Sequence, residues 1–402
     1  MPGKHITWFF RHFPKKKQRR ASAIRTAGLL TLTFVPVVGI SARLFAGTPG
    51  NEVSPPKFLG SQTCSSSSCH GGAAEKSNQF TIWSTHDFHH ARPYATLETA
   101  RSERLAEVLK LGNPTQSARC TVCHAPFGTV PAGRLGPGVQ VTEGVSCETC
   151  HGPAENWLRS HTRLDYTHAD RVAAGMRDLN NLYVRANTCV ACHQNLDPEI
   201  RAAGHPELIF EMDGQCATMP RHWHEEHPGA QSWLVGQAAA AREMSWQLAN
   251  EQSPSREMVE RWSGLAWVLG AQDQTTMNLL SPSHEDFVQA QARYDRLAQQ
   301  FADSSRSQID PAKAVGWLAG SADVFTQPNV SKTLAARRAE RLVLALDRLI
   351  PDLAGAKTNA AVNESLNKLF ADAQSLPDFE PKRFAKDLNT FHSSVAAFLE
   401  TK

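Results

Sequence analysis

Four pairs of cysteines, each followed at once by a histidine, constrain this chain of 402 residues more than any other feature. Three have the regular form C-x-x-C-H: Cys120 to His124, Cys147 to His151 and Cys189 to His193. The motif that comes first in the chain, Cys64 to His70, has two extra residues between its cysteines. This grouping suits two thiols that add to the vinyl groups of one haem, with the histidine as axial ligand of its iron. The motifs predict four covalently attached c-type haems.

Each predicted haem uses two cysteines and one proximal histidine. The predicted haem-binding cysteines are Cys64, Cys69, Cys120, Cys123, Cys147, Cys150, Cys189 and Cys192. The predicted proximal iron ligands are His70, His124, His151 and His193. Structural zinc is the main competing interpretation, because C-x-x-C pairs also build four-cysteine zinc sites, and redox dithiols or disulfides are a further one. A histidine after every pair favours haem, although the stretched first motif taken alone also fits a polar, serine-rich loop.

The N-terminal residues have the character of an export segment. Residues 1–26 carry eight basic and no acidic side chains, and the apolar run 27–40 follows directly. Cleavage after Ala42 or Ala46 is one outcome, and retention as a membrane anchor through residues 27–46 is the other. Because c-type haems are attached outside the cytoplasm, both outcomes predict a periplasmic protein, either soluble or anchored to the inner membrane.

The charge of the predicted exported body differs from that of the whole chain. Residues 1–47 hold nine of the 42 basic residues and none of the 39 acidic ones, so the remainder has a formal charge of −6. This negative charge argues against a nucleic-acid-binding function, which requires a basic surface. The expected partners are a redox donor and a redox acceptor with a basic docking face.

The composition predicts four segments: a leader or anchor over 1–47, a linker over 48–57, a tetrahaem domain over 58–230 and a haem-free helical domain over 231–402. The tetrahaem domain contains every cysteine and little sustained periodicity, as expected where porphyrins replace much of the core. The last segment predicts a helical bundle with helices over 231–250, 255–280, 285–302, 329–353 and 382–399. The predicted fold class is mainly α with little regular sheet.

Five further segments carry a family resemblance: Phe58–Cys64, His90–Tyr94, Gly144–Pro153, Ala203–Leu208 and Trp233–Gln237. Together with the haem motifs they resemble the multihaem cytochromes c of the tetrahaem cytochrome c-554 (c-554/c-prime) group, over roughly residues 58–240. Some relatives of this layout carry a further haem motif beyond the last of these segments. Here residues 262–280 contain no cysteine. The resemblance implies electron transfer and a distal iron ligand at His90.

Second axial ligands decide whether each iron is closed to substrate or open to it. The predicted distal ligands are His90, His161, His205 and His222. His161 follows the third motif by a short spacer, and His205 precedes Pro206. The alternative to His90 is His89, and the alternative to His222 is His168. We interpret His86, His224, His227, His284 and His392 as ordinary surface or hydrogen-bonding side chains. Cys216 is expected to be a buried free thiol, with an intermolecular disulfide as the alternative, and Met212 and Met219 to be core or loop residues.

These residues predict an electron-carrying multihaem cytochrome with no catalytic residue. The alternative is a haem enzyme that reduces or oxidises a small nitrogen or oxygen species at one five-coordinate iron. A second alternative is a redox or gas sensor or an assembly subunit, in which the cysteine-free half binds a partner.

Overall fold

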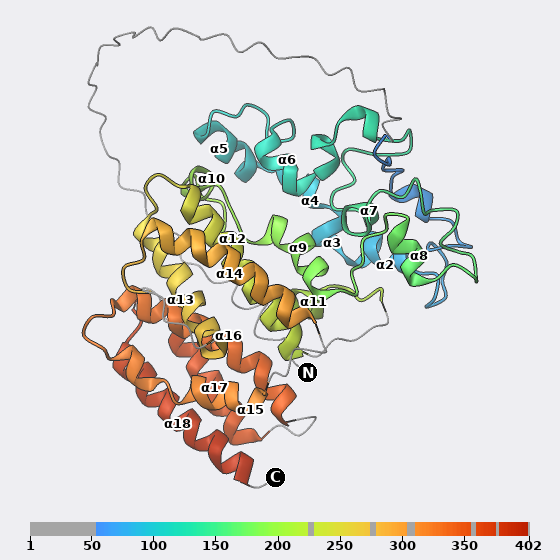
Figure 1. The fold of residues 1–402 in the computed structure, drawn as a ribbon. Coiled ribbons are helices and arrows are strands. Elements are labelled where there is room, and N and C mark those ends of the chain that lie inside the picture. Colours follow the sequence, from blue (N-terminus) through green and yellow to red (C-terminus); the bar gives the residue numbers. More distant parts are fainter. Residues whose placement is uncertain are drawn as a thin grey trace, which may run out of the picture.

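A computed structural model describes residues 54–223, 229–273, 279–303, 310–354, 359–374 and 378–400 (Figure 1). Within these ranges the chain consists of helices and irregular segments. Extended backbone pairs there at a single isolated parallel bridge, between Phe58 and Leu135. The predicted fold class, mainly α with little regular sheet, is confirmed.

The cysteine-containing half is built from short helices joined by loops (Figure 1). They are η1 (Ser61–Cys64), α2 (Gln79–His86), α3 (Phe88–Ala91), α4 (Pro93–Leu97), α5 (Ala100–Val108), α6 (Ala118–His124), η2 (Pro126–Thr129), η3 (Ala132–Arg134), α7 (Cys147–His151), α8 (His168–Ala173), α9 (Leu182–His193), α10 (Pro198–Ala202) and α11 (Met212–Thr218). Relatively few hydrophobic side chains are fully buried in this half, in contrast to the helices that follow.

Longer helices form the second half of the molecule. They are α12 (Gly229–Asn250), α13 (Arg256–Asp273), α14 (His284–Ala302), α15 (Pro311–Ala319), η4 (Ala322–Phe325), α16 (Lys332–Ala354), α17 (Ala360–Ala373) and α18 (Pro381–Glu400). The five helices predicted from the sequence correspond to α12, α13, α14, α16 and α18. The predicted end of the second one, at residue 280, lies beyond Asp273 and partly outside the described residues.

Local capping chemistry accounts for two of the helix starts. Ser283 accepts the backbone N–H of Asp286, whose carboxylate accepts the N–H of Ser283 in return at 2.7 Å. Asp310 accepts the N–H groups of Ala312 and Lys313, and Pro311 occupies the first turn of α15. Both starts satisfy N–H groups that have no partner inside the helix.

One hydrophobic core connects the two halves. Helix α12 lies against α9, α13, α14 and α16. The buried residues Leu182, Ala186 and Val190 of α9 belong to the same cluster as Trp233 and Leu234 of α12. The helix that ends in the fourth haem motif is therefore packed directly on the helical bundle. Helix α12 begins at Gly229, and packing continues across the boundary predicted at residue 230.

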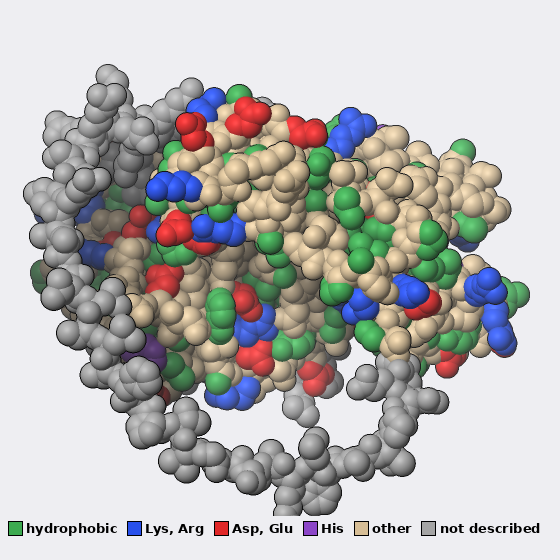
Figure 2. Space-filling model, turned by 90° about the horizontal axis from the view of Figure 1, so that it is seen from above, with side chains coloured by type: hydrophobic (Ala, Val, Ile, Leu, Met, Phe, Trp, Pro, Cys, Tyr) green, Lys and Arg blue, Asp and Glu red, His purple; other side chains and the backbone are tan. Residues whose placement is uncertain are grey.

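The surface is of mixed charge on the face drawn in Figure 2, where acidic and basic side chains are interspersed. None of the helices within the described ranges is long and apolar enough to span a membrane. The predicted leader or anchor, residues 1–47, and most of the linker lie outside the described residues.

The core predicts a marked cost for truncating a central side chain. Leu342 in α16 is fully buried, so Leu342→Ala should destabilise the protein by about 2–5 kcal/mol through lost burial and the cavity that remains. Leu164 is fully exposed, and Leu164→Ala should change stability by less than about 0.5 kcal/mol. Thermal and urea unfolding, followed by circular dichroism, measure both effects. Equal effects of the two variants would contradict the assigned core.

Candidate haem-binding site

The three regular motifs each lie on one side of a helix. Helix α6 ends at His124, α7 runs from Cys147 to His151, and α9 ends at His193. Residues three and four positions apart lie on the same face of an α-helix. Both cysteines and the histidine of each motif are therefore presented together, as attachment to one planar group requires. None of the nine cysteines, all of which lie within residues 54–223, forms a disulfide bond.

The stretched first motif forms a compact turn that absorbs its two extra residues. The N–H of His70 donates to the carbonyl of Cys64 at 3.2 Å, and the N–H groups of Cys69 and Gly71 donate to the carbonyl of Ser66 at 2.9 Å. A Cβ atom at Gly71 would lie 1.9 Å from the carbonyl oxygen of Ser65, so the turn requires glycine there. The turn returns His70 to the vicinity of Cys64 despite the longer spacing.

Three of the predicted proximal histidines face three of the predicted distal ones. The ring centres of His70 and His161 lie 6.1 Å apart, those of His193 and His90 lie 6.1 Å apart, and those of His124 and His205 lie 6.4 Å apart. Two imidazoles bound to one iron would have ring centres about 6 Å apart, because each metal–nitrogen bond is about 2 Å long and each nitrogen lies roughly 1 Å from its ring centre. The separations fit two imidazoles on opposite sides of one iron.

The hydrogen bonds of these rings leave the ligating nitrogen available. In six of the predicted ligands Nδ1 is bonded to a protein oxygen: His70 to Gln79 at 3.0 Å, His90 to Asp87 at 2.9 Å, His124 to the Pro93 carbonyl at 3.1 Å, His161 to the Leu158 carbonyl at 2.5 Å, His205 to the Pro206 carbonyl at 2.9 Å and His222 to the Pro220 carbonyl at 3.4 Å. Donation by Nδ1–H fixes the tautomer and keeps the lone pair on Nε2, as is usual for metal-bound histidine.

Two other histidines use Nε2 elsewhere. Nε2 of His168 is bonded to Asp178 at 3.0 Å, and Nε2 of His284 donates to the carbonyl of Ala249 at 3.0 Å. His284 therefore binds a carbonyl near the end of α12. These contacts distinguish both residues from the facing pairs. His224 and His227 lie outside the described residues.

The charge state of the site also suits metal ligation. Burial lowers the pKa of His151 and of His193 to about 4, so both imidazoles are neutral at pH 7. Burial alone would raise the pKa of Asp87, but its side-chain and backbone hydrogen bonds to His90, together with the charges of His90 and His222, outweigh this effect and lower the pKa. Asp87 is therefore a carboxylate that accepts from Nδ1 of His90, which strengthens His90 as a ligand.

His151 differs from the other three predicted proximal ligands. Among the described residues, no second ring faces it at the separation of the three pairs. His222 is close enough to lower the pKa of His151 through its charge, with burial as the larger cause. The charges of His70 and Arg177 lower the pKa of His151 in the same way, and His222 is the one predicted distal ligand among these three.

The four motifs are also close to one another through their thiols. Cys64 and Cys147 are close enough for each thiol to shift the pKa of the other, which lowers that of Cys64 and raises that of Cys147. The same relation joins Cys123 and Cys192, where the pKa of Cys192 is lowered. Cys150 of the third motif interacts electrostatically with Cys192 of the fourth. The first motif therefore lies next to the third, the third next to the fourth, and the fourth next to the second.

The buried carboxylate of Glu148, inside the third motif, ties that motif to two other segments. It accepts the N–H groups of Leu59 at 2.9 Å and of Gly60 at 2.7 Å, and that of Ala154 at 2.7 Å. Its side chain is 1% exposed. Glu148 thereby fixes the segment before the first motif against the third motif.

Several supporting residues were not predicted from the sequence. Gln79, Asp87 and the carbonyl of Pro93 hold ring nitrogens, and the amide nitrogen of Gln215 lies 3.4 Å from Nδ1 of His193. The one sequence signal that could have identified such a residue is a short separation from the histidine, as between Asp87 and His90. Cys216 is partly buried against the core, and burial raises the pKa of its thiol. Met212 is buried in the core, as expected.

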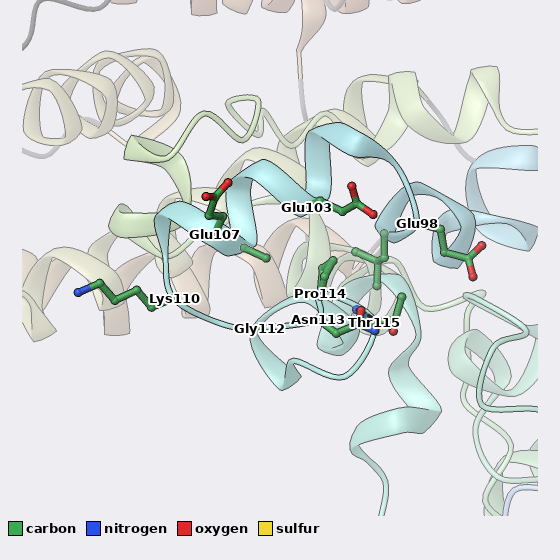
Figure 3. Close-up of a pocket in the computed structure, with 10 residues that line it drawn as sticks. Glu98, Glu103, Glu107, Lys110, Gly112, Asn113, Pro114 and Thr115 are labelled. Atoms are coloured by element: carbon green, nitrogen blue, oxygen red, sulfur yellow. Dashed lines mark hydrogen bonds between the residues drawn. The ribbon is translucent and has the colours of Figure 1, made fainter.

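A surface groove of about 620 Å³ lies apart from these histidines (Figure 3). It is formed by α5 and residues 112–115, with Glu98, Glu103 and Glu107 along it. The haem-motif cysteines and the paired histidines do not line it. We therefore place the functional site at the histidine pairs rather than in the groove.

Comparison with known proteins supports this assignment. Residues 63–152 match the model of the family described as cytochrome c554 and c-prime. This range includes the first three motifs and confirms the family resemblance there. No curated protein and no solved structure matches the chain significantly. The family match supports a c-type cytochrome that binds haem covalently and exchanges electrons with redox partners.

Loss of the Glu148 carboxylate should loosen the third motif. In Glu148→Gln one acceptor oxygen is replaced by an amide group, which leaves at least one buried N–H unpaired at a cost of about 1–3 kcal/mol. Thermal unfolding of the haem-loaded protein should show a lower midpoint. Glu155→Gln is the matched control, since Glu155 accepts the N–H of Lys57 at 2.8 Å in an exposed position. A midpoint equal to that of the control would contradict the role of Glu148.

Proposed function

We propose that this chain is a tetrahaem cytochrome c that carries electrons between redox proteins outside the cytoplasm. The observation that carries the proposal is the set of three histidine pairs with ring centres 6.1 to 6.4 Å apart. A zinc site built from the cysteine pairs would not require a second, distant histidine opposite each of these proximal ones. Electron exchange at the iron is the chemistry that bound haem would supply.

The proposed axial pairs are His70 with His161, His124 with His205, and His193 with His90. His151 has His222 as its proposed partner, supported by their electrostatic coupling and by the Nδ1 contact of His222 to Pro220 at 3.4 Å. The protein groups at Nδ1 hold each ring in orientation and increase its basicity. Irons with two histidines are closed to small substrates, which favours electron transfer over catalysis.

The thiol contacts favour a spatial order for the four haems. Cys64 adjoins Cys147, Cys150 is near Cys192, and Cys192 adjoins Cys123. The proposed order along the chain of cofactors is therefore first, third, fourth and second motif. Electrons would enter at one terminal haem, bound at Cys64 or at Cys123, and leave at the other.

The proposed setting is the periplasm, with the leader either cleaved or kept as an inner-membrane anchor. Support comes from the basic and then apolar residues 1–40 and from the covalent haem motifs. The acidic body favours donor and acceptor proteins with a basic docking face, because complementary charge raises association rates.

The alternative function is chemistry on a small nitrogen or oxygen species at the iron bound by His151. The specific observation in its favour is that the ring of His151 is not faced by another described ring as the other three are. Carbon monoxide binding to the reduced protein distinguishes the two functions. Binding by the parent protein favours the alternative, whereas binding by His222→Ala alone favours His222 as a ligand.

The haem count is directly testable. After acid and organic extraction, the intact mass should exceed that of the polypeptide by four haem groups, because each thiol pair forms two thioether bonds. An increase of three would show that the spaced motif at Cys64 and Cys69 is unused. No increase, with bound zinc in the native protein, would contradict the proposal.

The distal assignments predict a second result. Replacing His90, His161 or His205 by alanine should convert one low-spin haem to a high-spin form that binds carbon monoxide, because one iron loses an imidazole. Electron paramagnetic resonance and carbon monoxide difference spectra measure this change. His168→Ala and His284→Ala are the controls, since their Nε2 atoms bind Asp178 and Ala249. Parent spectra in all three distal variants would show that the assignments are wrong.

A further inference from the structure

The segment from His205 to Gln215 joins two of the proposed haem sites. At one end the ring of His205 faces that of His124. At the other end the amide nitrogen of Gln215 lies 3.4 Å from Nδ1 of His193. Between these ends the segment carries three acidic residues, Glu207, Glu211 and Asp213. Their environment determines how the segment is held.

Each of the three carboxylates is paired with arginine from the haem-free half. Glu207 lies 2.8 Å from Arg261 of α13 and 3.4 Å from Arg337 of α16. These three side chains are between 6% and 14% exposed, so the pairs are largely screened from water. Arg261 also donates to the carbonyl of Leu208 at 2.9 Å, which fixes the backbone as well as the carboxylate.

The other two pairs continue along α16. Arg341 lies 3.0 Å from Glu211, with both side chains 5% exposed, and Arg348 lies 2.9 Å from Asp213. Residues 337, 341 and 348 are spaced so that they share one face of the helix. We call Arg261, Arg337, Arg341 and Arg348 the arginine clamp. Its ion pairs recur over the whole length between Glu207 and Asp213.

Three further acids of the haem-free half contact the clamp, and one of them, Glu257, also lies 3.5 Å from Arg201 of α10. Glu340 lies 3.0 Å from Arg337, Glu257 lies 3.7 Å from Arg337, and Asp347 lies 3.5 Å from Arg348. These acids partly neutralise the arginines, yet each carboxylate of the 205–215 segment still has its own cation. Removing the cations of Glu207 would leave a largely buried carboxylate without compensation, which drives local rearrangement.

We propose that the arginine clamp positions the 205–215 segment so that His205 stays opposite His124, making the haem-free half a positioning part of the redox centre. This inference rests on the proposed haem ligation. The clamp residues act through the segment, and none of them binds iron. The helices α13 and α16 therefore do more than cover the haem-binding half: they hold an axial ligand in place.

The test uses the full-length, haem-loaded protein and the variant Arg261→Met/Arg337→Met, which removes both cations of Glu207. We expect a high-spin, carbon-monoxide-binding signal at one haem, at the spectral position seen in His205→Ala. Arg261→Lys/Arg337→Lys keeps the positive charges but loses the two-point contact of Arg337 with Glu207, so it should give a smaller high-spin signal than the methionine variant. All spectra are recorded at a temperature where circular dichroism shows intact helices.

Arg383→Met is the control for general loss of stability. Arg383 pairs with Asp372 at 2.8 Å between α18 and α17, and neither helix contains a clamp residue. This variant should unfold at a lower temperature but keep the parent spectrum. A high-spin signal in Arg383→Met would overturn the positioning role, since general loosening would then explain the effect.

The outcomes also separate this inference from the proposed function. If His205→Ala gives the high-spin signal and Arg261→Met/Arg337→Met does not, the clamp proposal is wrong while the ligand assignment holds. If His205→Ala itself keeps the parent spectrum, the ligation on which the clamp proposal rests is wrong.

Discussion

The attachment of a rigid, planar haem to residues within one helical turn is the constraint on which the rest of this structure depends. In the proposed ligation, Cys147, Cys150 and His151 of the short helix α7 would hold one haem. A second histidine would then have to come from another segment of the chain. The loops and short helices of the first half accordingly place histidines opposite one another, and apolar side chains gather in the second half instead.

Local features were predictable from the sequence, and long-range ones were not. The motifs placed cysteines and histidine on one helix face through their spacing alone, and periodicity predicted the helices observed as α12, α13, α14, α16 and α18. The partner of each proximal ring was not predictable, because spacing carries no information about which distant loop approaches. The coupling of His222 to His151 likewise depends on tertiary placement.

The arginines of α16 illustrate a second limit of sequence analysis. Charged residues repeated along a helix usually form a solvated face, and no pattern in the sequence separates that case from a buried one. Arg341 and Glu211 are 130 positions apart in the chain, and both are buried. The same distance in sequence separates Arg337 from Glu207. Only the packing of the two halves reveals that these charges face each other.

Ion pairs suit this interface for a physical reason other than stability. Apolar contacts set how closely the 205–215 segment approaches α12. Met212, for example, packs on Gly236 of α12 so closely that a Cβ atom on residue 236 would lie 2.8 Å from the Cβ atom of Met212. Apolar contacts tolerate sliding, whereas the contacts of Arg341 with Glu211 and of Arg348 with Asp213 define one register along α16. Burial raises the pKa of Glu211 to about 7 and that of Asp213 to about 6. A ligand that binds the native state alone stabilises that state. In the proposed ligation, the binding of iron by His205 and the folding of α16 would therefore stabilise each other through the same segment.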